Sequence, residues 1–147
     1  MSVDLRPITR ANFRDVIRLE VLPEQSTFVA SNAVSIAETY LRPEAEPRAV
    51  YADDELVGFV LLDPGGRPGE PELVRLMIDH RFQGRGLGRR ALEAAVDHAG
   101  REYAAQSVRL TFVPSNERAR ALYLSAGFEE TGEVEYGETV MVRKLRS

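Results

Sequence analysis

The sequence predicts an α/β fold in which one mixed, mostly antiparallel β-sheet is flanked by helices. Apolar residues recur at strand or helix spacing in a series of short segments whose order along the chain is βααβββαβαββ. A glycine-rich turn joins the central strand directly to the longest helix. Segments in this order pack most naturally as a sheet with helices on both faces. A chain of 147 residues has the size of one domain, and we expect residues 1–147 to form a single domain.

The chain begins with a predicted strand followed by a predicted helix. Residues 3–8 alternate between polar and apolar side chains, and the proline near their end suits an edge strand, where a missing N–H is tolerated. Thr9 is placed to cap a helix over residues 11–20, in which apolar side chains recur at helical spacing. Pro23 ends this helix because proline has no amide hydrogen to donate.

A second short helix and a pair of strands follow. Ser31 or Asn32 can cap a helix that extends to about residue 40 and buries one apolar stripe. The stripe consists of Val34, Ala37, Tyr40 and Leu41. Residues 49–52 and 56–62 fit two strands, and the two aspartates between them fit a tight hairpin turn.

The second half of the chain supplies the remaining elements. Its first segment, residues 63–72, is rich in glycine and proline and is predicted to be an exposed hairpin loop. The elements expected after it are strands over residues 73–78, 107–113, 128–133 and 138–145 and helices over residues 87–101 and 117–126. The longer helix carries charged residues four positions apart on one face, and His98, near this face, is expected at the surface.

The composition excludes several classes of function. The chain has no cysteine, which excludes a disulfide scaffold, thiol catalysis and thiolate metal sites, and with 2 histidines we expect no histidine-rich metal site. A formal net charge of −4 argues against general nucleic-acid binding and is compatible with a cationic substrate. The sequence shows no apolar run of transmembrane length and no signal peptide, so we expect a cytoplasmic protein without nucleic-acid or membrane partners.

The turn after the central strand has the composition of an anion-binding site. Residues 83–88, Gln-Gly-Arg-Gly-Leu-Gly, contain glycines that let backbone N–H groups approach a bulky anion closely. The N-terminus of the following helix adds unpaired N–H donors and the positive end of its dipole. The turn lacks the Gly-Lys-Ser/Thr of a nucleotide P-loop and the glycine spacing of the dinucleotide fingerprint. It therefore predicts a phosphate or pyrophosphate site of another type, with an ordinary glycine-rich turn as the alternative.

Two stretches resemble the GNAT superfamily of N-acetyltransferases. The spacing Gln-x-x-Gly-x-Gly at Gln83, Gly86 and Gly88 resembles its acyl-CoA pyrophosphate loop, and VPSNERARALYLSAGF over residues 113–128 resembles its second characteristic segment. The resemblance implies a GNAT fold, a single acyl-CoA N-acyltransferase domain, and acetyl-CoA as co-substrate without a metal. The cofactor-binding residues that it implies are Leu76, Met77, Ile78, Gln83, Gly84, Arg85, Gly86, Leu87, Gly88, Arg89 and Asn116.

The same resemblance implies roles in catalysis. Asn116 would hydrogen-bond the pantetheine arm of CoA, and Tyr123 would donate a proton to the departing thiolate, which a phenol can do. Both residues have a structural alternative, because Tyr123 belongs to an apolar helical stripe and Asn116 can cap the following helix. Glu72, on the central strand, would act as general base for the attacking amine, with a solvated surface carboxylate as the alternative.

A narrower resemblance within the superfamily is carried by the stretches FVASNAVSIAE, AVYADDELVGFVLL, RLMIDHRFQGRGLG, LYLSAGFEETGE and GETVMV. Over nearly its whole length the chain resembles the bacterial spermine/spermidine or diamine N-acetyltransferases. This resemblance implies a small primary amine, with a polyamine or diamine as the first candidate acceptor. Glu20, Glu24 and Glu38 are the candidate substrate-binding carboxylates, because the first two helices shape the acceptor site in this fold, with a solvated surface charge as the alternative for each. Peptide N-termini, amino acids and aminoglycosides are alternative acceptors, and a non-catalytic acyl-CoA-binding or sensing module is the alternative to an enzyme. We include a homodimer among the expected assemblies.

Overall fold

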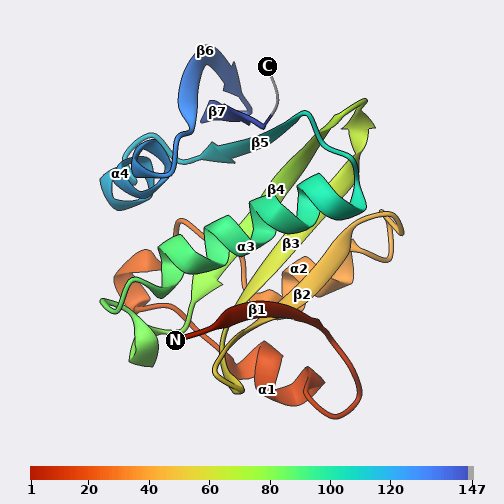
Figure 1. The fold of residues 1–147 in the computed structure, drawn as a ribbon. Coiled ribbons are helices and arrows are strands. Elements are labelled where there is room, and N and C mark those ends of the chain that lie inside the picture. The colour runs from red at the N-terminus through yellow and green to blue at the C-terminus, as the bar shows by residue number, and fades with distance from the viewer. Residues whose placement is uncertain (146–147) are drawn as a thin grey trace.

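The computed structural model describes residues 1–145 and confirms the predicted α/β fold and its order of elements. Figure 1 shows one sheet with helices on both of its faces. The strands are β1 (Val3–Pro7), β2 (Glu46–Ala52), β3 (Glu55–Arg67), β4 (Glu70–Ile78), β5 (Ser107–Phe112), β6 (Glu129–Glu135) and β7 (Glu138–Lys144). The helices are α1 (Phe13–Arg18), α2 (Asn32–Glu38), α3 (Leu87–Glu102) and α4 (Glu117–Ser125), with two short 3-10 helices, η1 (Pro23–Gln25) and η2 (His80–Phe82).

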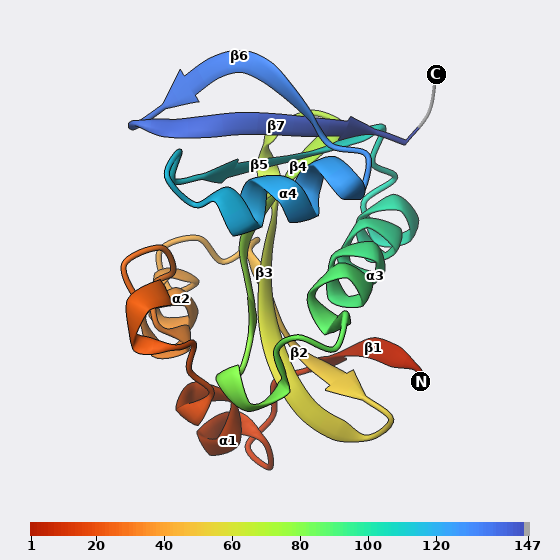
Figure 2. The same cartoon turned by 90° about the vertical axis from the view of Figure 1, so that its left-hand side faces the viewer.

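The sheet is continuous but is weakly joined at its middle. The strands follow the order β1-β2-β3-β4-β5-β7-β6, and every neighbouring pair is antiparallel except β4 and β5. These two parallel strands share a single register pair, Glu72 with Arg109. Figure 2 shows β5 turning away from β4. The C-terminal half of β4 therefore keeps one edge that is not paired with a strand.

Each face of the sheet has its own hydrophobic core. On β3, Val60 and Leu62 belong to the core under α3, whereas Phe59 and Leu61 belong to the core under α1 and α2, as the alternation of side chains along a strand requires. The buried stripe of α3 consists of Leu87, Ala91, Leu92, Ala95, Val96 and Ala99. Complete burial of a large apolar side chain contributes about 1.5–3 kcal/mol. The two cores therefore stabilise the sheet from both sides.

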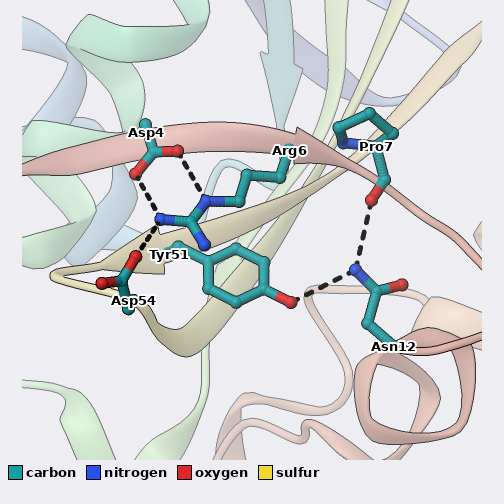
Figure 3. A network of polar contacts seen from close by, with 6 residues as sticks. All are labelled: Asp4, Arg6, Pro7, Asn12, Tyr51 and Asp54. Carbon is teal, nitrogen blue, oxygen red and sulfur yellow. Dashed lines mark hydrogen bonds and ion pairs between the residues drawn. The ribbon is translucent and has the colours of Figure 1, made fainter.

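Helix α1 begins later than the sequence predicts, and Thr9 is not its cap. The residue before the helix is Asn12, whose Nδ2 donates hydrogen bonds to the Pro7 carbonyl at 3.1 Å and to the Tyr51 hydroxyl at 3.2 Å (Figure 3). The Asn12 Oδ1 accepts from the Thr9 amide at 2.8 Å. The Arg6 guanidinium lies 4.3 Å from the centre of the Tyr51 ring. These contacts hold the β1–α1 connection as an ordered turn against β2, which shortens the helix.

Helix α2 has the predicted cap but not the predicted buried face. The Ser31 hydroxyl accepts a hydrogen bond from the Val34 amide at 3.2 Å, which confirms Ser31 as the cap. The side chains of Tyr40 and Leu41, by contrast, are 87% and 81% exposed. The helix ends at Glu38, so both residues lie beyond it and the expected stripe is wrong. None of the helices formed by residues 1–145 has the length and hydrophobicity that a membrane crossing requires.

The β3–β4 hairpin is longer than expected, and His98 is more enclosed. Residues 63–72 form no separate loop, because β3 continues to Arg67 and β4 begins at Glu70. Local glycine and proline content pointed to a loop, but strand pairing extends through most of the segment. The His98 side chain is 12% exposed and its Nε2 lies 2.9 Å from a Glu46 carboxylate oxygen, so its predicted surface position is wrong.

Candidate active site

A cavity of about 680 Å³ lies where β4 and β5 diverge. Protein ligand sites commonly have volumes of roughly 300–1,000 Å³. The ends of both strands line this cavity, together with the start of α3, helix α4 and the segment of residues 24–30 that precedes α2. Because the cavity passes between two strands of one sheet, groups from both faces of the sheet can meet in it. Within residues 1–145, no three His, Asp or Glu side chains are grouped so that they could hold a metal ion.

The glycine-rich turn borders this cavity and presents free backbone donors. The amide groups of residues 84–89 have no hydrogen-bond acceptor within the described part of the chain. Gly84 and Gly86 have φ angles of 81° and 77°, which glycine adopts without the steric cost that a Cβ imposes. Gly86 directly precedes α3, so the positive end of the helix dipole adds to these donors. This arrangement can bind a phosphate or pyrophosphate group.

Gln83 fixes the position of this turn through its side chain. Its Nε2 donates to the Ile78 carbonyl at 2.9 Å and to the Gln25 Oε1 at 3.0 Å, and its Oε1 accepts from Arg118 at 3.3 Å. Gln83 therefore connects β4, η1 and α4 around the cavity. Gln25 and Arg118 could not be predicted from local sequence patterns, because they lie 58 and 35 residues from Gln83.

The two arginines of the turn differ in their surroundings. The Arg85 guanidinium lies 5.6 Å from the centre of the Phe82 ring and forms no ion pair within residues 1–145. Arg89 instead donates to the Ser125 hydroxyl at 3.1 Å and lies 3.7 Å from a Glu93 carboxylate oxygen. Arg85 is thus available to an anion at the turn, whereas Arg89 links α3 to α4.

Asp79, which the sequence analysis missed, anchors the end of β4. Its carboxylate is buried and accepts hydrogen bonds from the backbone amides of Glu20 and Arg81, both at 3.0 Å, and from the Arg81 side chain at 2.8 Å. Burial alone would raise the pKa of Asp79, but these hydrogen bonds outweigh burial and the pKa is lowered. The ionised carboxylate therefore ties the end of α1 to the beginning of the glycine-rich turn.

Tyr123 lines the cavity from α4, and its ring also packs against the core. The ring lies 5.8 Å from that of Phe112 and 6.1 Å from that of Phe128, measured between centroids. Burial raises the pKa of the Tyr123 phenol to about 12, with no compensating hydrogen bond. The phenol is therefore neutral at physiological pH and can donate a hydrogen bond to a group in the cavity. The ring of Tyr123 therefore packs as a core residue while the side chain borders the cavity, and its catalytic role stays a prediction.

Asn116 and the end of β4 border the same cavity. The Asn116 side chain accepts from the Ala119 amide at 3.2 Å, which confirms that it caps α4, and Asn116 also lines the cavity. Leu76, Met77 and Ile78 pair with β3 on one edge, and their other edge has no strand partner. The main-chain groups on this edge can bind an extended amide-containing ligand such as a pantetheine arm.

The predicted substrate carboxylates lie in different places. Glu24 lines the cavity, but Glu20 and Glu38 do not. Glu38 lies 3.5 Å from the guanidinium of Arg75, which itself lines the cavity. The structure adds one carboxylate that was not predicted, that of Glu138 at the start of β7.

Glu72 lies at the closed end of the β4–β5 contact. Burial, followed by the nearby carboxylates of Glu135 and Asp63, raises the pKa of Glu72, against the opposing effect of Arg109. A raised pKa suits a general base, but Glu72 does not line the cavity. At roughly 3.3 Å per residue, it lies about 13 Å along β4 from Leu76. Its role as general base stays a prediction.

Comparison with known proteins identifies the family. The sequence matches the acetyltransferase (GNAT) family over residues 13–128. It is 30% identical over 152 residues to the spermine/spermidine N(1)-acetyltransferase of Bacillus subtilis, which covers 99% of this chain and 100% of that relative. It is also 38% identical over 143 residues to the N-alpha-acetyltransferase RimI of Mycobacterium tuberculosis, which covers 90% of this chain and 85% of RimI.

Solved structures agree with this assignment at the level of fold. The aminoglycoside acetyltransferase AAC(6')-Ib in complex with coenzyme A has a TM-score of 0.81 and 19% identity over 98% of this chain and 95% of that chain. A chimera of the spermidine N-acetyltransferase SpeG from Vibrio cholerae has a TM-score of 0.75 and 21% identity over 98% and 96%. The chain therefore belongs to the GNAT family and is an acetyl-CoA-dependent N-acetyltransferase.

Proposed function

We propose that this enzyme acetylates a primary amine of a polyamine or diamine. The observation that carries the proposal is the similarity to the B. subtilis spermine/spermidine acetyltransferase, which extends over essentially the full length of both chains. The cavity supports it, because Glu24 and Glu138 line the cavity and form no ion pair within residues 1–145. A linear polycation needs such carboxylates for docking, and the acidic net charge favours its approach.

In this proposal the cofactor side of the cavity is formed by the glycine-rich turn, α4 and the free edge of β4. The amides of residues 84–89 and the guanidinium of Arg85 bind the pyrophosphate of acetyl-CoA. Asn116 and the main chain of residues 76–78 bind the pantetheine arm. Gln83 positions the turn between them through its three hydrogen-bonded partners.

Tyr123 supports departure of the thiolate when the amine attacks the thioester carbon. An ordinary thiol has a pKa near 8.5, so complete proton transfer from a phenol with a pKa of about 12 is uphill by about 5 kcal/mol. Tyr123 therefore acts by donating a hydrogen bond to the sulfur as negative charge develops on it. Such a bond is strongest in the transition state, which is where it lowers the barrier.

A second candidate acceptor is a peptide N-terminus. Similarity to RimI over most of both chains favours it, as does Arg75 in the cavity. A peptide offers carbonyl oxygens as acceptors for an arginine at the cavity wall, whereas a protonated polyamine offers none.

A steady-state panel separates the candidates. Thiol release from acetyl-CoA is measured with spermidine, spermine, a diamine, aminoglycosides, free amino acids and peptides with free N-termini, each at two salt concentrations. We expect the highest kcat/KM with the polyamines and a decrease at higher salt, because screening weakens attraction to the carboxylates. A higher kcat/KM with peptides would favour the second candidate. No turnover of polyamines would refute the polyamine assignment.

A further inference from the structure

Glu138 lines the cavity but is not among the site residues that the sequence predicts. Its carboxylate accepts a hydrogen bond from the Thr111 hydroxyl at 3.0 Å, and both residues line the cavity. Glu138 forms no ion pair within residues 1–145. Its side chain is half-buried, so the charge is partly removed from water without a cation to neutralise it. A carboxylate in this situation is suited to receive a cationic or acidic group of a ligand.

The alternation of side chains places Glu138 and Tyr123 on opposite faces of the sheet. Leu110 and Phe112 belong to the core under α3, so Thr111 between them points to the α1–α2 face. Because Thr111 donates a hydrogen bond to the Glu138 carboxylate, the Glu138 side chain lies on the same face. Tyr123 packs on Phe112 and therefore approaches from the α3–α4 face. The cavity between β4 and β5 connects these two approaches.

The backbone holds Glu138 in a defined position. The β6–β7 turn contains Tyr136 and Gly137 with φ angles of 50° and 80°, and Glu138 directly follows as the first residue of β7. Two consecutive positive φ angles are typical of the tight hairpin turns that fix strand register. Thr111 then orients the carboxylate, so Glu138 is anchored through both its main chain and its side chain.

We infer that Glu138 is the carboxylate that orients the acceptor amine and takes its proton during acetyl transfer, with Thr111 as its positioning residue. This inference rests on the proposed function. The amine reaches the cavity from the α1–α2 face as the free base, after its ammonium has lost one proton to solvent. Its lone pair attacks the thioester carbon and forms the C–N bond, which makes the nitrogen positively charged and strongly acidic. Glu138 accepts one proton from this nitrogen, the C–S bond breaks, and the thiolate leaves with a hydrogen bond from Tyr123.

The protons and charges of these reaction steps balance without a further reactant. The products are the amide, CoA thiolate and protonated Glu138, which returns its proton to the thiolate or to solvent. The other charged or titratable groups lining the cavity are Glu24, Arg75, Arg118 and Tyr123, and Glu135 lies opposite Glu138 in the β6–β7 register. Of the groups from residues 1–145 that line the cavity, only Glu24 and Glu138 are carboxylates that can accept a proton. Glu138, at the start of β7, is the one that a hydrogen bond from Thr111 holds in position.

The test compares Glu138→Gln with Glu129→Gln, which changes an exposed glutamate on neighbouring β6. The glutamine at position 138 keeps the shape of the side chain and can still accept from Thr111, so only the charge and basicity are lost. With spermidine and with a free peptide N-terminus as acceptors, we expect Glu138→Gln to lower kcat by about 100-fold or more, within the range of general-base catalysis. CoA affinity by calorimetry should equal that of wild type.

Thr111 provides the second arm of the experiment. Thr111→Val removes the hydroxyl and keeps the shape, and we expect an intermediate loss of kcat that Thr111→Ser restores. A wild-type kcat in Glu138→Gln, alongside turnover by the wild type, would overturn this inference alone. Equal decreases in kcat for Glu138→Gln and Glu129→Gln would overturn the inference as well. If the wild type acetylates no amine of the panel, the proposed function fails and this inference fails with it.

Discussion

The two ends of the β4–β5 contact differ in how their polar groups are satisfied. At the closed end, where Glu72 pairs with Arg109, the buried Arg109 guanidinium forms ion pairs with Glu133 and Glu135. At the open end, the amides of residues 84–89, the Tyr123 hydroxyl and the Glu138 carboxylate have no charged partner within residues 1–145. Polar groups that satisfy one another hold the sheet together. Groups without a charged partner are the ones that a ligand can engage, so we expect the reaction at the open end.

The largest expected effect is at the glycine-rich turn. A Cβ at Gly88 would meet Leu122 and Ile78 only at ordinary contact distances of 3.8 and 4.0 Å, so the fold tolerates a side chain there. The valine side chain of Gly88→Val would nevertheless occupy the proposed pyrophosphate site. We therefore expect CoA affinity to fall by at least about 100-fold, which corresponds to about 2.8 kcal/mol of binding free energy. Calorimetry with CoA on the folded variant measures this.

Gly100→Val is the matched control, because it makes the same change in the same helix, where the added Cβ meets only Leu145 at 3.7 Å. We expect this variant to bind CoA like the wild type. Unchanged CoA affinity in a folded Gly88→Val protein would show that the turn is not the pyrophosphate site.

The next effect in size concerns the Tyr123 hydroxyl. Tyr123→Phe keeps the ring contacts with Phe112 and Phe128 and removes only the donor to the developing thiolate. We expect kcat to fall by roughly 10- to 1000-fold, with CoA affinity nearly unchanged. The control is Tyr103→Phe, whose hydroxyl donates to Glu46 outside the cavity and should affect stability rather than kcat. Wild-type turnover by Tyr123→Phe would make Tyr123 a core residue only.

The features that could be predicted from the sequence are those that depend on residues close together along the chain. The strand, glycine turn and helix around Gln83 follow from local periodicity and spacing, and so does the helix that carries Tyr123. Glu138 could not be found in this way, because its partner Thr111 lies 27 residues earlier and only the β5–β7 pairing brings them together. His98 was misplaced for the same reason, since its partner Glu46 is 52 residues away.

The errors in element boundaries also have physical causes. The glycines and prolines of residues 63–72 have strong turn preferences, but pairing between β3 and β4 outweighs these preferences over most of the segment. The stripe that included Tyr40 and Leu41 assumed a helix that continues past Glu38. The chain instead leaves the helix at Thr39, whose hydroxyl donates to the Ile36 carbonyl at 2.6 Å.

The smallest effect is expected at the closed end, and it tests whether Glu72 belongs to the structure or to the chemistry. Burial, with Glu135 and Asp63, raises the pKa of Glu72 in the folded protein. A carboxyl group with a raised pKa binds its proton more tightly in the folded state, so it lowers the free energy of unfolding once the pH exceeds the unfolded value near 4.3. Glu72→Gln removes this cost. We therefore expect its free energy of unfolding at pH 7 to exceed that of wild type by up to about 1 kcal/mol, with the difference vanishing below about pH 4.

Urea unfolding of Glu72→Gln, Glu129→Gln and wild type at pH 7 and at pH 4 measures this difference, and the exposed Glu129 should show none. A lower free energy of unfolding for Glu72→Gln at pH 7 would mean that attraction to Arg109 exceeds the cost of burial. The kcat of the same variant completes the comparison of the two ends. If the proton is accepted at the open end, Glu72→Gln should lower kcat less than Glu138→Gln does. A larger decrease in kcat for Glu72→Gln would make Glu72 the base, although it lies outside the cavity.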